Sequence, residues 1–211
     1  GSAGFSCYAD HWRKQVHLFE LDNRVFRVWK YLQQATTKDI LMLPNLKPGD
    51  KVPETLAPEE RWLLAYCIDQ GSSTIKNPAR TAKPRSNWGY LQNRIAHDLY
   101  KIRHWKIFNA PFSMASRVIR EPATWFIDPP YQHQGYQYTA QVGIPYSELG
   151  DWCQKLPGQV IVCEAAGADW LPFTPLVRIK STNKKNAAYM EVVWMNTGSQ
   201  RSLDAGNLLN C

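Results

Sequence analysis

One tetrapeptide, Asp128-Pro129-Pro130-Tyr131, combines an acid, two prolines and an aromatic residue in a pattern suited to chemistry. It directly follows residues 123–127, whose apolar, aromatic-rich sequence is typical of a buried strand. In open α/β sheets, ligands bind beyond the carboxyl ends of the strands. The sequence therefore predicts a reaction centre at the end of this strand.

These residue types suit an amino group whose lone pair is delocalised into an aromatic ring. The Asp128 carboxylate and the Pro129 carbonyl offer two acceptors for its N–H groups, which would draw the nitrogen towards a tetrahedral geometry and free the lone pair. Consecutive prolines stiffen the segment, and Tyr131 can stack on a base swung out of a nucleic-acid helix. The alternative interpretation is a proline turn in which Asp128 is a local cap.

The elements around this tetrapeptide alternate between strands and helices, which predicts an α/β fold with a doubly wound sheet. The expected strands are Val16–Glu20, Trp105–Phe108, Ala123–Ile127 and Gln159–Cys163, with a closing antiparallel strand pair at Leu176–Lys180 and Ala188–Met195. The expected helices are Phe5–Lys14, Asn23–Gln34 (with Asp22 as N-cap), Pro58–Ile68, Asn87–Ile102 and Tyr146–Lys155. An apolar stripe is expected along the helix 23–34, formed by Val25, Phe26, Val28, Trp29 and Leu32.

Composition and charge narrow the class of protein. The formal net charge of +7 favours a polyanionic partner, although it also fits a generically basic protein. The five cysteines form no Cys-x-x-Cys pair and the histidines show no metal-ligand spacing, so we expect reduced thiols and no metal site. No apolar run approaches the roughly 18–20 residues of a membrane span.

Residues 123–131 resemble the Dam-type family of S-adenosylmethionine-dependent DNA adenine-N6 methyltransferases, especially its small phage and prophage members. The resemblance implies a Rossmann-like methyltransferase sheet and transfer of a methyl group to adenine in DNA. Asp128, Pro129, Pro130 and Tyr131 would then be the catalytic residues, in an enzyme of the bacterial or phage-infected cytoplasm, such as a restriction-modification system. An RNA adenine methyltransferase and a catalytically silent nucleic-acid-binding protein of the same fold remain alternatives.

The same resemblance implies a site for the methyl donor, S-adenosylmethionine. The glycine loop at the start of the chain would approach the donor closely, and Glu20 would hold its ribose. Phe112, in the segment that follows the strand 105–108, would pack against its adenine. The residues so assigned are Gly1, Ser2, Ala3, Gly4, Phe5, Glu20, Asn109, Phe112 and Asp128. The alternatives are a cloning remnant for the glycine loop, a solvated acid for Glu20 and an ordinary loop for 109–112.

We expect nucleic acid to be held by basic and aromatic side chains. Residues 39–104 lie outside the resemblance and form a helical and loop insertion that we interpret as the target-recognition region. The candidate nucleic-acid-binding residues are Arg80, Lys83, Arg85, Gln132, Tyr136, Lys184 and Lys185. For any one of them, a solvated surface position is the alternative. Glu164, which ends the next strand, would line the same crevice as Asp128.

The whole chain, 1–211, is expected to form a single methyltransferase domain. In the family that it resembles, a central strand precedes the donor loop, whereas this chain opens inside the loop. A sheet without that strand would leave buried backbone groups unpaired. We therefore expect the natural protein to have residues upstream of Gly1.

Overall fold

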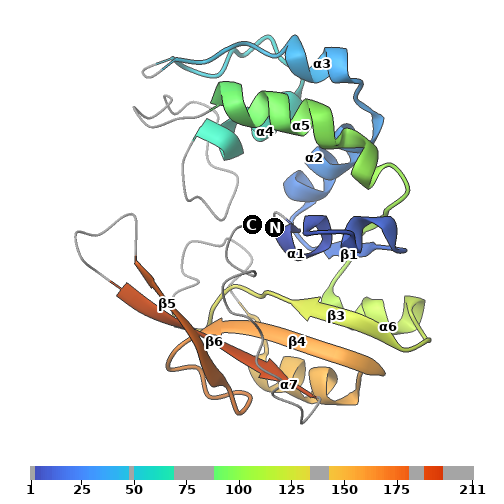
Figure 1. Cartoon of the computed structure of the whole chain (residues 1–211), viewed down its shortest axis with the longest axis vertical. Helices are drawn as coiled ribbons and strands as arrows, with labels where there is room; N and C mark the ends of the chain where they lie inside the picture. The colour runs from blue at the N-terminus through green and yellow to red at the C-terminus, as the bar shows by residue number, and fades with distance from the viewer. Residues whose placement is uncertain (1–2, 48–49, 69–87, 134–142, 181–187, 197–211) are drawn as a thin grey trace. The chain divides into compact units, whose positions relative to one another are not determined.

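The computed structural model describes residues 3–47, 50–68, 88–133, 143–180 and 188–196. The chain divides into two compact units, Gly1–Pro111 and Phe112–Cys211. Each unit has its own strands and helices (Figure 1).

The first unit contains a parallel pair of short strands, β1 (His17–Glu20) and β2 (Lys106–Asn109). Glu20 is level with Asn109, so both strands end at the same edge. Parallel strands need a long crossover connection, and the described part of this connection contains four helices. These helices are α2 (Asn23–Gln34), α3 (Thr37–Leu41), α4 (Pro58–Ile68) and α5 (Trp88–Ile102).

The core of the first unit lies among these helices and the start of β2. The apolar stripe of α2 buries Val28, Trp29 and Leu32, and the Trp29 ring lies 5.8 Å from the ring of Trp105. Gln92 is one of the few buried polar residues, and its amide donates to backbone carbonyl oxygens at the end of α3 at 2.9 Å. The stripe expected for α2 is thus confirmed as the face that the core covers.

The start of the chain differs from expectation. The single helix expected over Phe5–Lys14 is wrong: a short helix α1 (Gly4–Cys7) and a 3-10 helix η1 (His11–Arg13) take its place. Ala9 between them has a φ of 46°, in the left-handed region that an α-helix cannot contain. The helix α3 was not expected either. It follows a capping box in which Thr36 and Asp39 satisfy each other's backbone amides.

The second unit contains a four-stranded mixed sheet in the order β3-β4-β6-β5. The strands are β3 (Ala123–Ile127), β4 (Gly158–Ala165), β5 (Thr174–Lys180) and β6 (Ala188–Met195). β3 and β4 are parallel, and helix α7 (Tyr146–Lys155) lies between them in sequence. β6 is antiparallel to both β4 and β5, which confirms the expected closing pair.

Contacts of Trp152 join α7 to the start of this unit and to the sheet. The Trp152 ring of α7 meets the Trp125 ring of β3 edge-on, with 5.8 Å between ring centroids. Its indole N–H donates to Ser116 in the short helix α6 (Ala115–Val118), which follows the 3-10 helix η2 (Phe112–Met114). Leu149 and Cys153 of α7 are fully covered, as are Val160 and Val162 of β4.

The fold class is therefore mixed α/β, as expected, with a two-stranded parallel sheet and a four-stranded mixed sheet. A single doubly wound methyltransferase sheet remains a prediction. Within the described segments, no helix combines the length and the apolar character needed to cross a membrane.

Replacing Gly158 by alanine should lower the free energy of unfolding. A strained backbone position alone costs about 1–3 kcal/mol, and the loss in this variant should be larger. Gly158 has a φ of +94°, and a new Cβ would lie 2.3 Å from the Ala123 carbonyl oxygen. Gly143→Ala is the matched control, because Gly143 has a φ of +96° with nothing within 4 Å of the new Cβ. Urea denaturation compares the two variants. Equal losses would show that the clash with Ala123 contributes nothing.

Candidate functional site

The segment Asp128–Tyr131 leaves the sheet at the carboxyl end of β3. Ile127 pairs with Val162 of the parallel strand β4, so Asp128 follows the last paired residue just as Cys163 and Glu164 continue β4. The tetrapeptide therefore lies at the edge of the sheet where the sequence placed it, with the neighbouring strand extending beside it.

Two side chains from other elements hold the end of this segment. The Tyr146 hydroxyl, at the start of α7, donates to the Pro130 carbonyl oxygen at 2.6 Å. The Tyr131 hydroxyl donates to Oε2 of Glu191 on β6 at 2.8 Å. The tyrosine ring is therefore tied to the sheet by its polar end.

The residues that follow are bound to the β4–β5 connection. The Gln132 backbone amide donates to the Glu164 carboxylate at 3.0 Å, and its side-chain amide donates to Asp169 at 3.2 Å. The His133 ring nitrogen Nε2 donates to the Gly167 carbonyl oxygen at 3.1 Å. The Gln132 side chain, expected to face nucleic acid, is thus engaged within the protein.

The Pro129 carbonyl differs from these groups. Among the residues that the structure describes, no donor is bonded to its oxygen, whereas the next carbonyl along the chain accepts from Tyr146. A carbonyl without an internal partner is an acceptor for an external N–H group. This arrangement agrees with the second acceptor role expected for Pro129.

The electrostatic setting of Asp128 disfavours its charged form. The side chain keeps solvent-exposed surface, but burial of the carboxyl among the surrounding groups raises its pKa, and the negative charge of Glu164 raises it further. Raised carboxyl pKa values are common where burial and like charge meet at a functional site. The ionised form of Asp128, which would accept an N–H group, therefore lowers the free energy of unfolding.

Neighbouring groups remain protonated. Burial raises the pKa of the Tyr131 hydroxyl, with the negative charges of Asp128 and Glu191 adding to the shift, so this hydroxyl remains a hydrogen-bond donor. Burial likewise raises the pKa of the Cys163 thiol to about 12. Only a thiolate is a good nucleophile, and this raised pKa keeps the Cys163 thiol protonated near pH 7.

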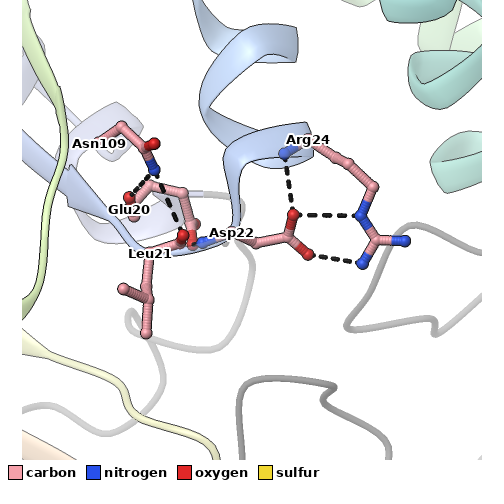
Figure 2. A network of polar contacts seen from close by, with 5 residues as sticks. All are labelled: Glu20, Leu21, Asp22, Arg24 and Asn109. Carbon is pink, nitrogen blue, oxygen red and sulfur yellow. Dashed lines mark hydrogen bonds and ion pairs between the residues drawn. The ribbon is translucent and has the colours of Figure 1, made fainter.

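The strand ends of the first unit form a second cluster, shown in Figure 2. The Asn109 side-chain amide donates to the backbone carbonyl oxygens of Glu20 and Leu21, at 2.9 and 3.3 Å. The Glu20 carboxylate accepts from the Asp22 backbone amide at 2.9 Å. Asn109 is the last residue of β2 rather than the first beyond it. Its amide therefore fixes the turn that carries the Glu20 carboxylate.

Asp22 is committed to the fold. Its carboxylate accepts from the Arg24 backbone amide at 2.8 Å, which confirms the expected N-cap of α2. Both carboxylate oxygens also accept from the Arg24 guanidinium, as Figure 2 shows. The guanidinium holds the pKa of the Asp22 carboxyl below its usual range, although burial opposes the shift.

The other residues assigned to the donor are engaged locally. Ala3 precedes α1 with a φ of 50°, and Gly4 and Phe5 begin that helix. The Phe5 ring lies 4.7 Å from the ring of His11. Phe112 lies in the second unit, with its ring 5.2 Å from that of Trp152. The Phe112 ring, expected to face a ligand, therefore has an aromatic partner in α7.

Several candidates lie outside the residues that the structure describes. They are Gly1, Ser2, Arg80, Lys83, Arg85, Tyr136, Lys184 and Lys185. Among the described side chains, no group of three or more histidine, cysteine or acidic residues could hold a metal ion.

Sequence reasoning missed Glu191 and Tyr146, and it gave Glu164 only a place beside the crevice. A signal for Glu191 was present, because an acid interrupts the apolar strand 188–195. Their partners at positions 130–132 lie 16–60 residues away along the chain. No local pattern could have identified them.

Comparisons with known proteins give no family: no protein-family profile and no curated protein matches the chain. The geometry of the two clusters is therefore the basis for assigning a function.

Asp128→Asn should unfold at a higher temperature than the wild-type protein near pH 7, because the neutral amide avoids the cost of a disfavoured carboxylate. A raised pKa in the folded state means that this cost is absent below the ordinary value of 3.8 and grows as pH rises through the raised pKa. The gain in melting temperature should therefore shrink on acidification towards pH 4.

Thermal melts from pH 4 to pH 8 measure this difference. Asp151→Asn, at an exposed position on α7, is the matched control and should show a smaller change with pH. A gain for Asp128→Asn that does not depend on pH would contradict the assignment.

Proposed function

We propose that this protein transfers a methyl group from S-adenosylmethionine to the exocyclic N6 amino group of adenine in DNA. The observation that carries the proposal is the segment after β3. There the Asp128 carboxyl and the Pro129 carbonyl stand at the carboxyl end of a parallel strand, and the residues that follow are bonded to β4, β6 and α7.

The amino nitrogen of adenine is a weak nucleophile because its lone pair is conjugated with the ring. Acceptors at Asp128 and Pro129 would each take one of its N–H groups and favour a tetrahedral nitrogen. Fixed acceptors need no reorganisation during the reaction, which is the main source of electrostatic catalysis. The nitrogen would lose one proton on methylation, and this proton would pass to the Asp128 carboxylate that faces its N–H group.

The donor site has a fitting group in the first unit. Glu20 presents a carboxylate at the carboxyl end of β1, oriented by the Asp22 amide and by the turn that Asn109 fixes. A carboxylate accepts hydrogen bonds from ribose hydroxyls, so Glu20, held in the turn that Asn109 fixes, would bind the ribose of the donor. When bound, S-adenosylmethionine supplies an electrophilic sulfonium methyl group.

The charge of the chain supports a nucleic-acid substrate. The formal net charge of +7 would attract a polyphosphate by release of counterions. Tyr131 offers an aromatic face on which an unstacked base can rest. The bond from its hydroxyl to Glu191 would hold that ring in one orientation.

A methyl-transfer assay with labelled donor tests the proposal on duplex DNA, single-stranded DNA and structured RNA. The wild-type protein should label adenine N6 in DNA. Asp128→Ala should lose about 100- to 1000-fold in rate, the usual effect of removing one group that stabilises a transition state. Asp151→Ala, at an exposed position on α7, is the control and should transfer at the wild-type rate.

The outcomes of this assay separate the alternatives. Label confined to RNA would make the protein an RNA methyltransferase. Absence of label with every substrate, while the protein still binds nucleic acid, would leave a catalytically silent binding protein. Donor binding is followed separately, since a donor at about a hundredfold over its dissociation constant stabilises the fold by roughly 2.7 kcal/mol.

Tyr131→Ala should reduce both transfer rate and affinity for the base, because stacking of a base on an aromatic ring contributes about 1–3 kcal/mol. Tyr131→Phe keeps the ring and should retain most of the activity. It also removes the donor to Glu191, which should lower the free energy of unfolding by about 1–3 kcal/mol. Transfer kinetics and urea denaturation measure the two effects. Wild-type transfer by Tyr131→Ala would rule out the stacking role.

A further inference from the structure

Glu164 occupies a position where the strand pattern calls for an apolar residue. Side chains two residues apart lie on the same face of a strand, and Val160, Val162 and Glu164 of β4 are each 0% exposed. A carboxyl group without solvent is unfavourable unless hydrogen bonds compensate it. Its presence at the third core-facing position therefore needs a specific explanation.

The contacts of the carboxylate supply that explanation. Oε1 accepts from the Ala165 backbone amide at 2.8 Å, and Oε2 accepts from the Trp170 indole N–H at 3.1 Å. The Gln132 backbone amide donates to Oε2 at 3.0 Å and to Oε1 at 3.3 Å. All three partners are N–H groups that can only donate. A carboxylate, with two acceptor oxygens and no donor, matches this set, whereas a glutamine would turn an NH₂ group towards one of the donors.

The two prolines make this contact decisive for the segment after β3. Pro129 and Pro130 have no backbone N–H, so neither residue can donate a backbone hydrogen bond to the sheet. Gln132 supplies the backbone amide that anchors the segment to the sheet, and Glu164 receives it. The Trp170 bond ties the β4–β5 connection to the same carboxylate, and the Trp170 ring lies 5.7 Å from that of Tyr146. Tyr146 in turn donates to Pro130.

We infer that Glu164 is a positioning residue, which holds the segment carrying Asp128 and Pro129 in its reactive geometry by accepting the Gln132 backbone amide. The inference rests on the proposed function for its effect on catalysis. The hydrogen bond itself does not depend on that function. Glu164 would act through the segment rather than on the substrate.

The test compares Glu164→Gln and Glu164→Asp with two controls. Glu164→Asp keeps the charge but shortens the side chain by one methylene, so its carboxylate should reach Gln132 poorly. Glu148→Gln removes an exposed acid of α7. Gln132→Ala removes the contact with Asp169 but keeps the backbone amide that Glu164 accepts.

The first readout is hydrogen exchange at the Gln132 amide, measured by NMR, which needs no activity. Exchange should be at least about tenfold faster in Glu164→Gln than in the wild-type protein, because one acceptor oxygen is replaced by an NH₂ group and the Gln132 amide must then compete for the remaining oxygen. Glu164→Asp should fall between them, and Glu148→Gln should match the wild type. An exchange rate in Glu164→Gln equal to that of the wild-type protein would overturn the inference. If Glu164→Gln does not fold, the exchange rate in Glu164→Asp decides in the same way.

The second readout is methyl transfer. Glu164→Gln should lower kcat by about 10- to 100-fold, because small displacements of reacting groups have effects of this size, while KM for the donor changes less than about threefold. A purely structural role would lower the melting temperature but leave kcat of the folded variant unchanged, which would overturn the positioning role. If the wild-type protein transfers no methyl group, the proposed function fails, and the exchange result alone decides whether Glu164 holds the segment.

Discussion

The loop after β3 depends on hydrogen bonds made by side chains, because its sequence removes the backbone donors that would otherwise fix it. The two prolines directly after Asp128 have no backbone N–H to donate. Glu164 of β4 instead accepts from the Gln132 amide, and Tyr146 of α7 donates to the Pro130 carbonyl. The Pro129 carbonyl between these anchored groups has no donor among the described residues.

The carboxyl groups that suit the proposed chemistry lower the stability of the fold. Burial and the neighbouring Glu164 charge raise the pKa of Asp128, so the fold tolerates a carboxylate that would be more stable protonated. Glu164 itself is enclosed in the core at a position suited to valine. Natural proteins often retain such unfavourable groups where activity needs them. Two acids close together at the ends of the neighbouring strands β3 and β4 are difficult to explain by stability alone.

In both units, a polar side chain of one strand binds backbone groups at the end of the neighbouring parallel strand. In the first unit, the Asn109 amide crosses from β2 to the carbonyl groups at the end of β1 and steadies the turn beside the Glu20 carboxylate. In the second unit, Glu164 of β4 crosses to the residue that follows the segment after β3. Each polar side chain links the carboxyl ends of parallel strands, where ligands bind in α/β folds.

The sequence by itself determined the elements whose signals are local. The Asp22 cap and the apolar stripe marked α2, and the run before Asp128 marked β3 with its acidic end. The sequence could not place the partners of that end. Glu164 and Glu191 lie more than 30 residues from Gln132 and Tyr131, which they bind after β3, and strand pairing brings them together. The extended Tyr8 and the left-handed Ala9 interrupt the single helix expected over Phe5–Lys14. Tertiary packing decides such contacts because burial selects backbone and hydrogen-bond geometries that neighbouring residues do not specify.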